Sequence, residues 1–138
     1  MKKILPALAA GACSTAALTL ATAIPASAAT VYQAGSCQAR GDFATCVASG
    51  NMKQPSSIWV NFHGFPSQKV HVAWSMVCSK GSGAGSKSGS FNDNDGVGHW
   101  KIPHPYARPG SCSVSADAQL QGSHGTKINV WLTYTRWS

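Results

Sequence analysis

The sequence predicts an all-β fold, a small disulfide-stapled antiparallel β-sandwich of immunoglobulin-like size that follows a cleaved signal peptide. Apolar residues recur at every second position over several short segments, and no segment after residue 28 keeps a helical period through three turns. Clusters of Gly, Pro, Asn and Ser interrupt these segments about every ten residues, as in sandwiches. The cysteines of the same region favour a core stapled by two disulfide bonds.

The N-terminus has the pattern of a secretory signal. Two lysines precede an apolar run, Ile4 to Ile24, which is followed by the cleavage pattern Ala26-Ser27-Ala28. We therefore predict a signal peptide over 1–28, a single β-sandwich domain over 29–138, and a secreted, extracellular protein. No later run approaches the ~18 apolar residues of a transmembrane helix, so no membrane span is expected in the mature chain.

The first half of the mature chain predicts two weak strands and one clear strand. The weak strands cover 43–49 and 57–63, separated by Gly50-Asn51 and by Pro55. The clear strand covers 69–79, where five residues alternate onto one face: Val70, Val72, Trp74, Met76 and Cys78.

The Gly- and Ser-rich segment 80–90 is predicted to be a flexible surface loop. It resembles a phosphate-binding loop, but Ser86 stands where glycine should precede Lys87, and no helix follows. A short strand is expected over 97–102. The proline-rich segment 102–109 after it is expected to form a rigid loop at a sheet edge, because proline cannot occupy a central strand.

The last two predicted strands cover 111–121 and 127–135. Cys112, Val114, Ala116, Ala118 and Leu120 alternate onto the core face of the first, and Ile128, Val130, Leu132 and Tyr134 onto that of the second. The connection Gly122-Ser123-His124-Gly125 is typical of a hairpin, so these two strands are expected to pair.

Four of the five cysteines lie beyond the predicted signal peptide, which contains Cys13. Three pairings are possible, and we favour Cys37–Cys46 and Cys78–Cys112. The first two cysteines flank a turn-forming segment, and the last two occupy core positions of their strands. No C-x-x-C motif is present, so a zinc site is not expected.

The composition argues against common catalytic machinery. Charged residues make up 11% of the chain against about 25% in an average domain, and the sequence has four Asp and no Glu. Paired-Glu glycosidase sites are therefore excluded, and no serine-hydrolase elbow is present. The five histidines are expected at the surface. We predict a protein that is not an enzyme and needs neither metal nor cofactor.

Charge also bears on the partner. Removal of the two signal-peptide lysines lowers the formal charge from +7 to +5, which is modest for a DNA-binding protein. Nucleic acid is therefore not an expected partner.

Tryptophans supply the main candidate binding residues. Trp59 and Trp131 alternate with the apolar residues of their strands and are predicted to face outward, where exposed tryptophan favours a binding role. A reversed assignment for the strand of Trp59, or an edge that folds over both rings, is the alternative. Trp137 and Tyr106 are predicted to extend the same surface.

Several segments together resemble a group of bacterial proteins: the Ala-rich signal, Ser111-Cys-Ser-Val-Ser-Ala-Asp-Ala-Gln-Leu120, the Gly/Ser hairpin and Ile128-Asn-Val-Trp-Leu132. This combination resembles small secreted two-disulfide proteins of Streptomyces and related actinobacteria, among them the adaptor subunit of umbrella-shaped secreted antibacterial toxin particles. The resemblance implies a β-rich adaptor that joins a stalk protein to a lectin subunit. It also implies an extended N-terminal strap, here 29–36, and it assigns no functional residue.

Three hypotheses for function follow. The first is a secreted, non-enzymatic protein–protein interaction module that acts as an adaptor in a toxin complex. The second is a carbohydrate- or cell-wall-binding module, because tryptophan stacks on sugar rings and a basic surface suits anionic wall polymers. The third is a secreted protease inhibitor that presents loop 37–46 or 103–109. The expected partner is thus another secreted protein or a cell-wall polysaccharide.

Overall fold

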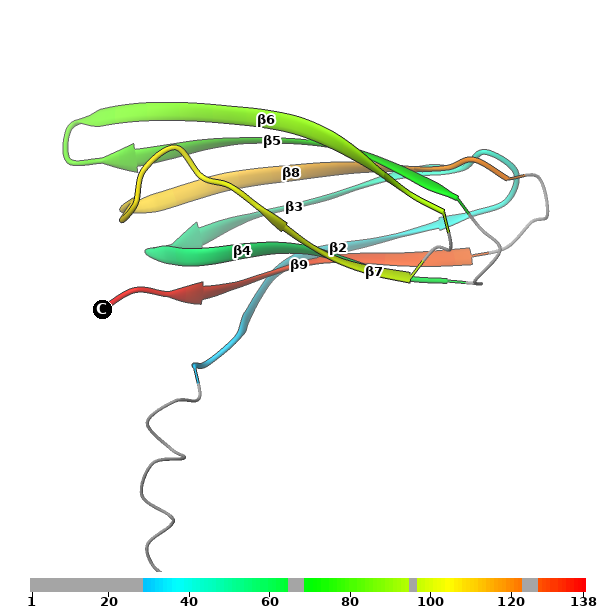
Figure 1. Cartoon of the computed structure of the whole chain (residues 1–138), viewed down its shortest axis with the longest axis horizontal. Helices are drawn as coiled ribbons and strands as arrows, with labels where there is room; N and C mark the ends of the chain where they lie inside the picture. Colours follow the sequence, from blue (N-terminus) through cyan, green and yellow to red (C-terminus); the bar gives the residue numbers. More distant parts are fainter. Residues whose placement is uncertain (1–28, 65–68, 95–96, 123–126) are drawn as a thin grey trace, which may run out of the picture. The chain divides into compact units, whose positions relative to one another are not determined.

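The computed structural model describes residues 29–64, 69–94, 97–122 and 127–138, and the predicted signal peptide lies outside these ranges. Within them the chain forms eight strands (Figure 1): β2 (Tyr32–Arg40), β3 (Thr45–Lys53), β4 (Pro55–His63), β5 (Val70–Lys80), β6 (Gly83–Asp93), β7 (Val97–Ile102), β8 (Ser111–Leu120) and β9 (Lys127–Arg136). None of the described segments is a helix with the length and apolar character needed to cross a membrane.

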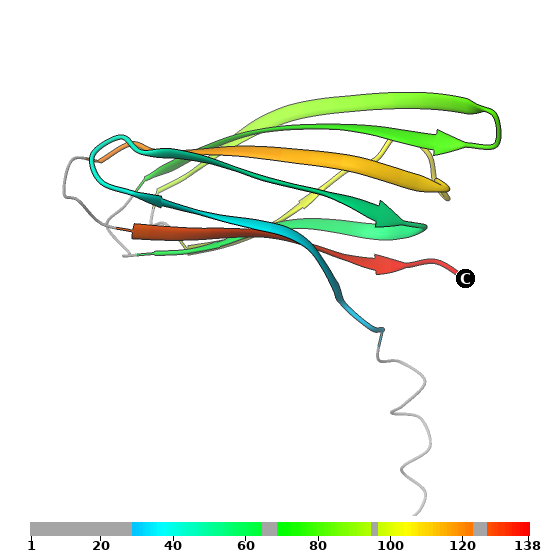
Figure 2. The same cartoon turned by 180° about the vertical axis from the view of Figure 1, so that it is seen from behind.

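The strands form two four-stranded sheets that pack face to face (Figures 1 and 2). One sheet has the order β2-β9-β4-β7 and is called here the β4/β9 sheet; the other has the order β3-β8-β5-β6 and is called the β5/β8 sheet. Every pairing is antiparallel. The predicted all-β sandwich is therefore confirmed.

The core lies between the sheets and follows the alternation seen in the sequence. All five predicted core residues of β5 are buried, and the predicted core faces of β8 and β9 are buried as well. The strand β4 adds Ile58, Val60 and Phe62, each at most 1% exposed. Burial of these faces supplies the main favourable free energy of folding.

Both predicted disulfides are present; one lies within a sheet and the other links the two sheets. Cys78 and Cys112 are direct register partners on the inner face of β5 and β8, with Cα atoms 4.0 Å apart. The Cys37–Cys46 bond instead links β2 to β3, and so joins one sheet to the other. Two such bonds in a small domain are compatible with secretion.

The edges of the two sheets come close together beside the Cys37–Cys46 bond. A Cβ atom added at Gly35 would lie 2.1 Å from the Ser49 carbonyl oxygen, and one at Gly50 would lie 2.0 Å from that of Ala34. Gly50 therefore lies inside β3, where the absence of a side chain lets the two edges approach each other. The predicted break at Gly50-Asn51 is wrong. The strand begins only at Thr45, since Phe43 has a positive φ of 53°.

The expected pairing of the last two strands is also wrong. β8 pairs with β3 and β5, whereas β9 pairs with β2 and β4 in the other sheet. Alternation shows which face of a strand is buried, but both layers of a sandwich bury such a face, so it does not choose the layer. Residues 123–126 of the expected hairpin lie outside the described residues.

The predicted loop over 80–90 is a strand. β6 pairs with β5 along its whole length, after a turn in which Gly81 has a φ of 60°. Two of its inward positions, Gly85 and Gly89, carry glycine because aromatic rings occupy the space. A Cβ atom at Gly89 would lie 2.7 Å from Cζ2 of Trp74, and one at Gly85 would lie 2.8 Å from Oη of Tyr106. The strand thus has no apolar alternation of its own for most of its length.

The first strand, β2, was not predicted. It forms an edge of the β4/β9 sheet and pairs with β9, and its register shifts between Gln33 and Gly35. This irregularity disturbs the alternation that reveals strands in a sequence. Residues 32–36 of the segment implied as a strap belong to this strand.

Candidate binding face

The outer surface of the β4/β9 sheet carries the two tryptophans that the sequence placed outward. Trp59 and Trp131 are half-buried, and the residues beside them in β4 and β9 point into the core. The alternative in which the strand of Trp59 is reversed is excluded, because Ile58 and Val60 are both fully buried. We call this surface the tryptophan face.

The register of the sheet brings the two tryptophans into neighbouring rows. Trp59 lies between Lys101 of β7 and Thr133 of β9. Trp131 lies in the next row, between Asn61 of β4 and Ser36 of β2. Residues that are direct partners in antiparallel strands have Cβ atoms about 5 Å apart, so these side chains form one continuous surface.

A hydrogen-bond network lies between the tryptophans. Asn61 is on the outer face but only 5% exposed. Its Nδ2 donates to Oγ1 of Thr133 at 2.9 Å and to the backbone carbonyl of Trp131 at 3.3 Å. Its Oδ1 accepts a hydrogen bond from Nδ1 of His99. The buried amide is thus satisfied on both sides, as a buried polar group must be.

The same histidine positions one of the indoles. The rings of Trp59 and His99 are stacked, with centroids 4.0 Å apart and an interplanar angle of 7°. Nζ of Lys101 lies 5.9 Å from the Trp59 ring centroid. Trp59 is therefore held by contacts on the surface of the sheet rather than by the core.

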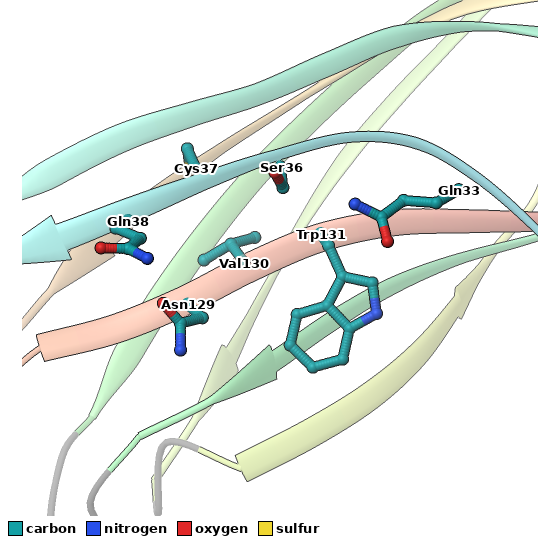
Figure 3. A pocket seen from close by; sticks show the side chains of 7 residues that line it. All are labelled: Gln33, Ser36, Cys37, Gln38, Asn129, Val130 and Trp131. Atoms are coloured by element: carbon teal, nitrogen blue, oxygen red, sulfur yellow. The ribbon is translucent and has the colours of Figure 1, made fainter.

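A pocket of about 230 Å³ lies beside Trp131 (Figure 3). Figure 3 shows the side chains of Asn129 and Trp131 on the same side of β9. The pocket is lined by Gln33, Ser36, Cys37, Gln38, Asn129, Val130 and Trp131. Among the described residues, Oδ1 of Asn129 is a buried acceptor with no hydrogen-bond partner.

The structure does not bring the other two candidate residues onto the tryptophan face. Trp137 lies at the end of the sandwich, where its Nε1 donates to the carbonyl of Pro109 at 2.8 Å. Tyr106 packs against the core and over Gly85 of β6, in the other sheet. The prediction that both residues extend the surface of Trp59 and Trp131 is therefore wrong, because the segment 103–110 crosses between the sheets.

Sequence reasoning missed several residues of this site. His99 and Asn61 occupy outward positions of predicted strands, so alternation was available as a signal for them. Gln33, Ser36 and Gln38 had no such signal, because β2 itself was not predicted. In the described part of the chain, no group of three or more His, Cys, Asp or Glu side chains is arranged to hold a metal ion.

Comparison with known proteins adds no relative: no family model matches the chain, and no curated protein matches it.

Proposed function

We propose that this protein is a secreted binding module that contacts another protein through the tryptophan face. The observation that carries the proposal is the placement of Trp59 and Trp131 in neighbouring rows on an outer sheet surface. Tryptophan is the residue type most enriched among side chains that dominate binding energy at protein interfaces. The solvated face of an antiparallel sheet is usually polar, so two neighbouring tryptophans on it support a binding role.

The contacts around the tryptophans support this role. His99, Asn61 and Thr133 hold the surface in one arrangement before a partner arrives. A surface ordered in advance loses less conformational entropy on binding, which raises affinity.

The resemblance noted in the sequence extends the proposal to an adaptor subunit of a secreted antibacterial toxin complex. Purification of the native protein from culture supernatant under mild conditions tests this. We expect the chain to purify with at least one larger secreted protein. Migration as a free monomer, with no second chain, would contradict the adaptor role.

Variants on the face test the binding role itself. Trp59→Ala and Trp131→Ala should each weaken binding to the purified partner by tenfold or more, the effect of about 1.4 kcal/mol or more. Trp100→Ala is the matched control. Trp100 is 38% exposed, but it lies in the edge strand β7 and its ring stacks on that of Phe91 in the other sheet, with the two centroids 4.6 Å apart. Equal losses in all three variants would count against the tryptophan face.

The pocket beside Trp131 favours a second candidate, a carbohydrate-binding module. A sugar ring can pack on the Trp131 indole while its hydroxyls hydrogen-bond to polar side chains that line the pocket, Asn129 among them. Asn129→Leu should then abolish retention on cell-wall polysaccharide at raised salt and leave binding to a protein partner unchanged.

The protease-inhibitor hypothesis stays a prediction. An inhibition assay of the purified protein against secreted proteases tests it.

A further inference from the structure

One end of the sandwich gathers cations from four separate segments. The β3–β4 connection, the β5–β6 turn, the loop 103–110 and the C-terminus lie together there (Figures 1 and 2). Backbone hydrogen bonds tie them: Gln54 donates to the carbonyl of Gly110 at 2.8 Å, Gly110 to that of Ser79 at 2.7 Å, and Trp137 to that of Gln54 at 2.9 Å.

Four exposed cationic side chains occupy this end, and we call it the basic end: Lys53, Lys80, Arg108 and Arg136. The described residues place no Asp or Glu side chain beside them. Asp42 lies in the β2–β3 turn and Asp93 at the far end of β6. Asp117 stands six residues along β8 from Ser111, a rise of roughly 20 Å.

Three of the cations lie over aromatic rings. The guanidinium of Arg136 is 4.9 Å from the ring centroid of Tyr32, that of Arg108 is 5.8 Å from Trp137, and Nζ of Lys80 is 5.8 Å from Tyr106. Arg136 also donates from Nε to the carbonyl of Lys53 at 3.1 Å. An aromatic face positions a cation without neutralising it, so the charges stay available to a partner.

We propose that the basic end binds a linear anionic polymer whose phosphate or carboxylate groups bridge these cations. This site is independent of the tryptophan face. A polymer fits better than an acidic folded protein, since the aromatic rings here are covered by cations and do not present an open anchor for an interface core. Polyanion binding needs no such anchor, because it is driven by charge neutralisation and counterion release.

The test measures binding of the secreted protein to polyphosphate and to polygalacturonate at 50 and 200 mM salt. If four cations each release counterions as they do on nucleic acid, the dissociation constant should rise roughly 50- to 150-fold over this range. Binding of one polymer alone would identify the anionic group. Failure of both polymers to bind at 50 mM salt overturns the proposal, even if an acidic protein is captured.

Two double variants distinguish binding at the basic end from a general effect of the protein's net charge. Lys53→Gln with Arg108→Gln should weaken polymer binding at 50 mM salt tenfold or more and flatten its salt dependence. Lys69→Gln with Lys127→Gln, at the opposite end of the sheets, is the control with the same net charge and should change binding less than twofold. Equal weakening by both pairs overturns the proposal. Lys80→Gln provides a second variant if the first pair lowers the thermal midpoint. Trp131→Ala should leave polymer binding unchanged.

Discussion

Trp131 is proposed to contribute to binding, and its position on the outer face predicts a small contribution to stability. Its indole is half-buried on the outer face, whereas Trp74 is 8% exposed in the core. We expect Trp131→Ala to lower the free energy of unfolding by about 1 kcal/mol and Trp74→Ala by about 3 to 5 kcal/mol. Urea denaturation of the two variants provides the measurement. A loss for Trp131→Ala as large as that for Trp74→Ala would place Trp131 in the core.

Asn61 is the residue on which the order of the tryptophan face depends. Asn61→Leu removes the hydrogen bonds to Thr133 and His99 and leaves both partners on the surface of the sheet. We expect a loss of about 1 to 3 kcal/mol in unfolding free energy, together with weaker partner binding, since His99 also stacks on Trp59. Thr133→Val, which removes one of these bonds at nearly constant volume, should have the smaller effect on both measurements.

Among the strands, β6 depends on its glycines, because the absence of a side chain at Gly89 leaves room for the Trp74 ring. Gly89→Ala would place a methyl group 2.7 Å from the Trp74 ring and should cost about 1 to 3 kcal/mol. Gly83→Ala is the matched control, because its Cβ would meet nothing closer than the Lys80 carbonyl oxygen at 3.6 Å. Thermal unfolding compares them. Equal midpoints for the two variants would show that β6 behaves as the loop predicted from sequence.

The two disulfides should differ in their contribution to stability. Cys78–Cys112 spans 34 residues and Cys37–Cys46 spans nine. In the chain-entropy model these loops correspond to about 4 and about 3 kcal/mol. Cys78→Ala with Cys112→Ala should therefore reduce stability more than Cys37→Ala with Cys46→Ala, as measured by denaturant unfolding. The reverse order would indicate that joining the two sheets matters more than the length of the closed loop.

At the scale of the whole molecule, the two proposed sites occupy different parts of the sandwich. The tryptophan face is built on paired strands within one sheet, whereas the basic end collects its cations from segments of both sheets. Separate surfaces allow a partner protein and an anionic polymer to bind at the same time.

Local sequence patterns were enough to predict the fold class and the inward or outward direction of most strand residues, and to favour the disulfide pairing that the structure has. These predictions depend on local features: side chains alternate with a period of two, Cys78 and Cys112 occupy core positions of their strands, and Cys37 and Cys46 flank a turn. Trp59 and Trp131 could be placed outward for this reason, from the apolar residues on either side of each.

Which strands are neighbours depends on how the two sheets pack, and local patterns do not predict it. Asn61 and Trp131 are 70 residues apart in the chain, and β8 and β9 are consecutive but lie in different sheets. Such pairings follow from packing two layers around one core, which local periodicity does not encode. The same packing explains why a Gly- and Ser-rich segment forms the strand β6. The rings of Trp74 and Tyr106 lie against its glycines, where a larger side chain would not fit. The packing also brought Lys53, Arg108 and Arg136 to one end of the molecule, where backbone hydrogen bonds between distant segments hold them together.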